Sequence, residues 1–242
     1  MPPARQPVPK LRFDKAGYYF TGLFLLAFLG FWKSYFSGFF NGTGSHHFYF
    51  HFHAVMMLTW LVLLIVQPLL IRYKKIKLHR AIGRFSYVVM PLLLISVLLV
   101  LNSGLKAIPQ NEISFSTVIF PIRDFFLLII AFTIAILYRH KIQIHARAMI
   151  ITGIIFIEPA LFRFLGKVVF EGMDPWGFFT GIFLILGLLM GLLFIERKQS
   201  SGRWLFPSLL VVDILVYALV VAQTDLSFMD PLIRWFARQP LT

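Results

Sequence analysis

Two histidines of this chain lie within nearly the same short phrase. Residues 75–81 read KIKLHRA and residues 141–147 read KIQIHAR, so His79 and His145 each follow a Lys-Ile pair and precede a nearby arginine. Two imidazoles that face each other across a helical bundle can be the axial ligands of a b-type haem, and basic neighbours suit its propionates. The plainer interpretation is an interfacial segment whose basic residues bind lipid phosphates. The phrase therefore indicates either a haem or metal site or a membrane-surface segment.

A second group of histidines lies in SHHFYFHFHAVMMLTW, which contains His46, His47, His51 and His53. If a helix begins early here, His47 and His51 share a face at a spacing that can hold one metal ion. Extended backbone would instead group His47, His51 and His53. The chain has no cysteine, so thiolate ligands are excluded, while zinc, copper or iron would suit imidazole. A histidine-rich interface without metal is the alternative.

Charged residues also occur inside long apolar runs, where each costs several kcal/mol and is a candidate functional group. They are Arg123, Asp124, Glu158, Arg163 and Asp213. We predict that Arg123, Arg163 and Asp213 line a polar cavity on the side of the second histidine group. Glu158 and Asp124 would support a metal there or pass protons. The alternative is a purely structural network of ion pairs between helices.

The composition indicates whether the elements that carry these residues lie in water or in lipid. Hydrophobic residues make up 59% of the 242 residues and charged residues only 14%, against about 25% charged in a soluble domain. Several apolar runs are long enough to cross a hydrocarbon core of about 30 Å as helices. Lipid offers no hydrogen bonds to the backbone, so spans of this kind are helical. The sequence predicts an all-α polytopic membrane protein.

Breaks rich in Gly, Asn, Ser and Pro divide the apolar sequence into seven runs, which predict a bundle of seven transmembrane helices. The expected spans are 17–36, 50–72, 85–103, 116–138, 148–170, 176–195 and 204–223. The domain organisation is then a basic N-terminal tail over 1–16, a transmembrane domain over 17–223 and a C-terminal tail over 224–242. That last tail, with DPLIRWFARQPLT, fits either a short amphipathic interfacial helix or a frayed end.

Lysine and arginine are distributed unevenly between the two sides of this topology. Sixteen lie in the N-terminal tail and the even-numbered connections, and five lie on the other side. By the positive-inside rule the N-terminus is cytoplasmic and the C-terminus is outside, in a multi-pass protein of the inner membrane. The same rule explains the net charge of +13, so the expected partner is the lipid bilayer and not nucleic acid. A homo-oligomer or a membrane-complex partner is left open.

Both repeated phrases then fall at the cytoplasmic side, each leading into an outward span. Spans two and three and spans four and five therefore look like two copies of one hairpin, related by an axis along the membrane normal. In this arrangement His79 and His145 enter the bundle at equal depth.

The first three spans resemble an uncharacterised family of bacterial multi-spanning membrane proteins. The resemblance rests on FWKSYF at 31–36, HFHAVMMLTWLVLLIVQPLLI at 51–71 and LHRAIGR at 78–84. The matching positions are His51, His53, Trp60, Gln67, Leu78, His79, Arg80 and Gly83. This resemblance implies a membrane protein and no particular activity. The chain is also faintly similar to b-type cytochromes of membranes, but its outer histidines all come from one helix, so only His79 and His145 fit that likeness.

The leading functional hypothesis is a metal- or haem-binding, redox-active membrane protein. Its inner ligands would be His79 and His145, and its cofactor haem b or a transition metal. One alternative is a small proton-coupled transporter with an outward-facing polar cavity. Another is a structural or assembly subunit of a membrane complex. The sequence names no substrate and does not decide whether the protein is an enzyme.

Overall fold

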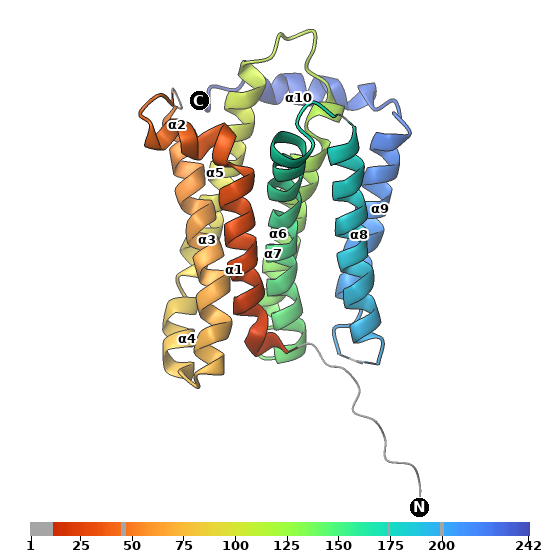
Figure 1. Ribbon diagram of the computed structural model, residues 1–242. Helices are drawn as coiled ribbons and strands as arrows, with labels where there is room; N and C mark the ends of the chain where they lie inside the picture. The colour runs from red at the N-terminus through yellow and green to blue at the C-terminus, as the bar shows by residue number, and fades with distance from the viewer. Residues whose placement is uncertain (1–11, 45–46, 174, 199–200) are drawn as a thin grey trace, which may run out of the picture.

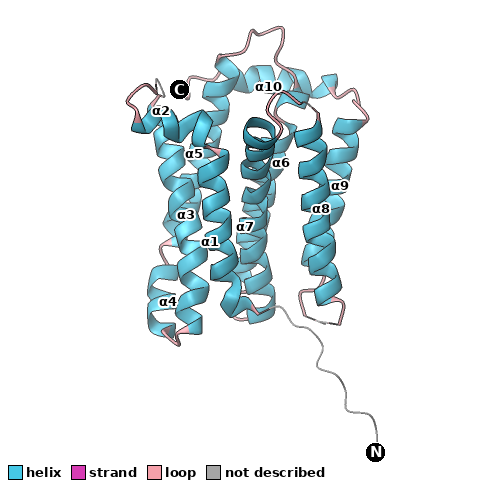
Figure 2. Cartoon of the chain, in the orientation of Figure 1, coloured by secondary structure: helices cyan, strands magenta, loops and turns pink. Residues whose placement is uncertain are grey.

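The protein is a bundle of long apolar helices. The computed structural model describes residues 12–44, 47–173, 175–198 and 201–242, and within these ranges the chain is helical with no strand (Figures 1 and 2). The long helices are α1 Ala16–Gly30, α3 Phe48–Arg72, α5 Ser86–Lys106, α6 Ile119–Leu137, α7 Ile142–Phe164, α8 Trp176–Glu196 and α9 Leu205–Val221. The short elements are η1 Phe13–Lys15, η2 Trp32–Phe36, α2 Ser37–Phe40, α4 Ile76–Gly83, η3 Phe115–Thr117, η4 Leu165–Val169, η5 Ser227–Met229 and α10 Asp230–Ala237.

Five helical segments in the described ranges are long and apolar enough to cross a membrane. They are Phe48–Arg72, Ile76–Lys106, Ile119–Leu137, Ile142–Val169 and Trp176–Glu196. The first apolar run makes a sixth if α1 and the helix that follows it, bent by 51° from it, count as one span. Helix α9 has 17 residues, about 25 Å of helix, which is at the lower limit of the length that crosses a membrane. The all-α class with several apolar helices is thus confirmed, while the count of seven and the orientation of the termini stay predictions.

Helix α1 lies between α3 and α7, α5 packs on α3, and α6 packs on α7. Helices α8 and α9 pack on each other and on α7 (Figure 1). Small residues allow α1 and α7 to approach closely, as is common where helices meet in membranes. A Cβ at Gly30 would collide with the backbone carbonyl of Ala160, and one at Gly153 would collide with the ring of Phe20. The order α5, α3, α1, α7, α6 encloses the space discussed below.

The two ends of the bundle differ in character. We call the end that carries η1 and the turns 73–75, 138–141, 197–198 and 201–204 the basic end, because most lysines and arginines of the described residues lie there. The opposite end carries α10, which lies across the bundle (Figure 1). In α10, Ile233 is buried and Asp230 accepts a hydrogen bond from Phe115 N at 2.8 Å. Asn102 of α5 donates a hydrogen bond to the carbonyl oxygen of Phe236 in α10, also at 2.8 Å. Of the two predictions for the C-terminal tail, the amphipathic helix is the one found. Residues 1–11 of the predicted N-terminal tail lie outside the described residues.

Candidate functional site

The two repeated phrases fold in the same way at the basic end. Lys75 and Lys141 stand directly before α4 and α7. Their carbonyl oxygens accept the backbone N–H groups of His79 and His145, in both cases at 3.0 Å. Lys74, in the turn before α4, has a φ of 58°. This value lies in the left-handed region, as is usual where a helix ends in a tight turn. Each histidine therefore occupies the same place in the first turn of its helix.

Each imidazole is also tied to the helix that precedes its turn. His145 Nδ1 lies 2.8 Å from the carbonyl oxygen of Ala135 on α6, and His79 Nδ1 lies 3.3 Å from that of Gln67 on α3. A carbonyl oxygen can only accept, so in these bonds Nδ1 carries the proton and Nε2 keeps its lone pair. Metal-bound histidines are commonly held in this way, with the second ring nitrogen donating to a backbone carbonyl.

Gln67 contacts His79 through its side chain as well. With its amide nitrogen turned toward the ring, Gln67 donates to His79 Nδ1 at 2.5 Å and accepts from Gly83 N at 3.1 Å. This contact favours the tautomer in which Nε2 is protonated, whereas the backbone contact favours the tautomer in which Nε2 is free. The side chain and the backbone carbonyl of Gln67 thus favour different tautomers of His79, and the sequence did not reveal these contacts.

Both histidines line one cavity of about 890 Å³ at the basic end. Residues from α1, α3, α4, α5, α6 and α7 enclose it, and its size lies within the roughly 300–1,000 Å³ typical of cofactor and ligand pockets. The two imidazoles are half-buried. The apolar part of the wall includes Phe20, Trp60 and Met149. The structure thus brings together the pair predicted as inner ligands.

The polar part of this wall is positively charged. Arg80, Arg84 and Arg139 line the cavity. Among the described lining residues the one acid is Asp14, and it already pairs with Arg12 at 3.1 Å and with Arg72 at 3.0 Å. Three arginines are therefore left for an anionic group, which guanidinium binds well. The indole Nε1 of Trp60, buried on the same wall, has no hydrogen-bond partner among the described residues.

A buried ion pair fixes α7, the helix that carries His145. Arg147 is 1% exposed and Glu196 at the end of α8 is 2% exposed. The guanidinium binds both carboxylate oxygens, with Nη2 2.9 Å from Oε1 and Nε in close contact with Oε2. Arg147 Nη1 also donates to the backbone and side chain of Gln143. The sequence analysis missed Glu196, although a single acid before the basic run RKQSSGR was the available signal.

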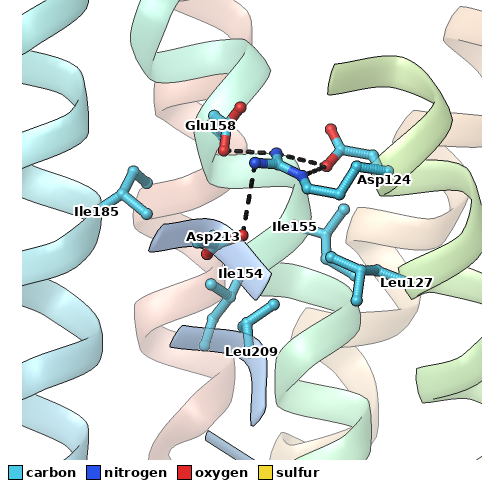
Figure 3. Close-up of a pocket in the computed structure, with 9 residues that line it drawn as sticks. Asp124, Leu127, Ile154, Ile155, Glu158, Ile185, Leu209 and Asp213 are labelled. Carbon is cyan, nitrogen blue, oxygen red and sulfur yellow. Dashed lines mark hydrogen bonds and ion pairs between the residues drawn. The ribbon is translucent and has the colours of Figure 1, made fainter. Parts of the chain in front are cut away.

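Four of the five charged residues predicted within the apolar runs form a separate cluster in the half of the bundle nearer α10. Arg123 donates to Asp124 at 2.7 Å and to Glu158 at 2.6 Å, and its Nη1 lies 3.5 Å from Asp213 (Figure 3). Tyr217, which the sequence analysis missed, donates to Glu158 at 2.6 Å. The space that these residues line is only about 10 Å³, far below a substrate-sized cavity.

Arg163 does not join this cluster. Its side chain is exposed, its guanidinium lies over the Phe31 ring at 4.6 Å, and it donates to the Pro159 carbonyl at 3.0 Å. In place of the predicted polar cavity, the structure has a compact network of Arg123, three acids and a tyrosine.

The outer histidines point to different partners. Helix α3 begins at Phe48, so His47 precedes it as an exposed N-cap residue and the extended alternative for this segment is not found. His51 Nδ1 lies 2.7 Å from Tyr35 Oη, and His53 Nδ1 lies 3.0 Å from Ser96 Oγ on α5. His46 lies outside the described residues. Within the described ranges no group of three or more His, Cys, Asp or Glu residues is placed to hold a metal ion.

No family model matches this chain, and no curated protein and no solved structure matches it either. Arguments about function therefore rest on the geometry above.

Proposed function

We propose that the protein is a redox-active membrane protein that holds a b-type haem between His79 and His145 at the basic end. The observation that carries the proposal is the matched pair of imidazoles. Both rings line one cavity, and both have Nδ1 held by the carbonyl of the preceding helix. This arrangement leaves the Nε2 lone pair of each ring available to bind iron. When bound, the haem supplies a one-electron couple between ferric and ferrous iron.

The other residues of the cavity suit the chemistry of the macrocycle. Phe20, Trp60 and Met149 offer an apolar wall to its ring, and a dry environment is one of the factors that set a haem potential. Arg80, Arg84 and Arg139 offer guanidinium groups to its propionates. The role of Gln67 is to orient His79, because its backbone carbonyl accepts the Nδ1 proton. A metal bound at Nε2 would be compatible with the Gln67 amide oxygen facing the ring, where it would accept from the Nδ1–H group.

The orientation belongs to the same proposal. We infer that the chain crosses the inner membrane seven times, with the basic end in the cytoplasm, because lysine and arginine concentrate on the cytoplasmic side of membrane proteins. The described part of the chain starts at the basic end and finishes at the α10 end (Figure 1), which agrees with an odd number of crossings. Lipid would then surround the exposed apolar faces, and the haem would exchange electrons at the cytoplasmic surface.

The charge cluster gives less support to the rival proposal of a carrier. Its residues are packed against one another around a space of about 10 Å³, which leaves no room for a substrate of ordinary size. A carrier would also leave the paired histidines and the large cavity of the basic end without a role.

The test is an absorption spectrum of detergent-purified protein from haem-sufficient cells, oxidised and then reduced. We expect a Soret band that shifts on reduction, with one haem per chain and a low-spin signal in electron paramagnetic resonance. His79→Ala and His145→Ala should each lose the haem or become high-spin. His47→Ala, the same change at an exposed position of the opposite end, is the matched control and should keep the wild-type spectrum.

Two results would refute this assignment. One is a protein that stays colourless after purification and after addition of haemin. The other is an unchanged low-spin spectrum in both histidine variants. A loss of haem in His140→Ala with retention in His145→Ala would move the second ligand to His140, which also lines the cavity.

A further inference from the structure

The cluster around Arg123 contains more acid than base. Arg123, Glu158 and Asp213 have side chains 6%, 6% and 5% exposed, and Asp124 is 20% exposed. These four are the charged residues among the described ones that line the space between α6, α7, α8 and α9, and α8 contributes Ile185 (Figure 3). If all three acids were ionised, this buried site would carry a net charge of −2.

An uncompensated charge in an apolar interior is expensive, so such groups take up protons rather than stay ionised. The cost is greatest inside a membrane, where intramembrane charges pair with one another or mark proton and ion pathways. One guanidinium can offset one of the three carboxylates fully. The cluster therefore retains at least one proton in the folded protein.

The hydrogen bonds indicate which acid holds that proton. Glu158 Oε2 accepts from Arg123 Nη2 and from Tyr217 Oη, both at 2.6 Å. Asp124 Oδ1 accepts from Arg123 Nε at 3.0 Å and from Nη2 at 2.7 Å. Among the described residues, the one polar approach to the Asp213 carboxylate is that of Arg123 Nη1, at 3.5 Å. Because hydrogen bonds to the charged form stabilise a carboxylate, Asp213 is the least stabilised anion of the three.

Arg123 also has a buried hydrogen-bond donor without a partner among the described residues. This donor is its Nη1, which lies 3.5 Å from Asp213 Oδ1. A buried donor without an acceptor is unfavourable, because it has given up its hydrogen bond to water. The space of about 10 Å³ is close to the roughly 10–15 Å³ that one water molecule needs.

We propose that Asp213 is a proton-binding site, neutral at pH 7, joined to Arg123 Nη1 by a single water molecule. The ligand of this second site is thus a proton, held in the half of the bundle opposite the histidine cavity. The groups that face it are Arg123 and Asp124 from α6, Glu158 from α7 and Tyr217 from α9, while α8 presents apolar side chains. This proposal does not depend on the haem, and either can fail alone.

The experiment is infrared spectroscopy of the protein in lipid at pH 7. A neutral carboxylic acid has a carbonyl stretch well separated from the bands of carboxylates and amides, and the stretch shifts in D₂O. We expect such a band in the wild type, and we expect carbon-13 in the aspartate carboxyl groups to displace it. Asp213→Asn should remove the band. Asp225→Asn should keep it, because Asp225 is exposed and the Ser227 backbone N–H lowers the pKa of Asp225.

Asp213→Glu keeps a carboxyl group in place and guards against a variant that fails to fold. In this variant the band should remain but no longer respond to aspartate labelling. The proposal is overturned if the wild type has no such band at pH 7 or if the band survives in Asp213→Asn. It is also overturned if the band appears only when sodium is removed, because a cation would then be the occupant.

Discussion

Breaking the Arg147–Glu196 pair should cost far more than an ordinary ion pair, and the two single changes should differ. Arg147→Met leaves the Glu196 carboxylate, which is 2% exposed, with no hydrogen-bond donor among the described residues. A buried charge stripped of its partner costs about 3–5 kcal/mol. Glu196→Gln should cost less, about 2 kcal/mol, because one hydrogen bond to the amide oxygen can persist. Arg147 would also keep its two bonds to Gln143.

The double change separates a buried charge from a general packing defect. Arg147→Met with Glu196→Leu removes both charges and replaces them with apolar groups, a change that is often neutral or stabilising. The free energy of unfolding of all four proteins would be measured in mixed micelles titrated with sodium dodecyl sulfate, followed by circular dichroism. A double-mutant cycle then gives the coupling energy. A cost below about 1 kcal/mol for Arg147→Met, the range of an exposed pair, would refute the reasoning. A double variant no more stable than Arg147→Met would refute it as well.

Two other predictions concern helix packing and topology. Gly30→Ala should destabilise the protein by about 1–3 kcal/mol, because its Cβ would meet the backbone of Ala160. Gly22→Ala should be close to neutral, because a Cβ at Gly22 has nothing within 4 Å. Thermal unfolding of both variants makes the comparison, and equal stabilities would contradict the close approach of α1 and α7. The chain has no cysteine, so Ser201→Cys and Ser227→Cys each introduce a single exposed thiol, one at each end of the bundle. A membrane-impermeant maleimide applied to spheroplasts should label Ser227→Cys and reach Ser201→Cys only after lysis, and the opposite pattern would invert the proposed orientation.

The sequence was sufficient for the class of fold and for the matched histidines. Apolar runs of about twenty residues leave the backbone few options other than helix, and the repeated Lys-Ile-x-[Leu/Ile]-His phrase predicted two similar turns. The first and last spans were harder, because a bend after Gly30 and the shortness of α9 depend on packing. Periodicity alone does not show where an apolar helix stops crossing the membrane.

The charged residues were easier to find than to group. Arg123, Asp124, Glu158 and Asp213 are conspicuous in apolar sequence, and the structure brings them together. Arg163 is equally conspicuous, but it lies on an exposed face of α7. Polar groups of ordinary type, such as Gln67 and Tyr217, gain their importance only from contacts between helices. A single sequence gives no measure of those contacts.

The order in which the chain is made has a consequence for the histidine cavity. The described residues that line the cavity end at Ile150, so its walls are complete once the first turns of α7 have entered the membrane. Glu196, the partner of Arg147, is synthesised only at the end of α8. In the order of synthesis, the described residues that line the pocket therefore all precede Glu196. If the helices pack in that order, the proposed haem would meet the pocket before Arg147 and Glu196 pair.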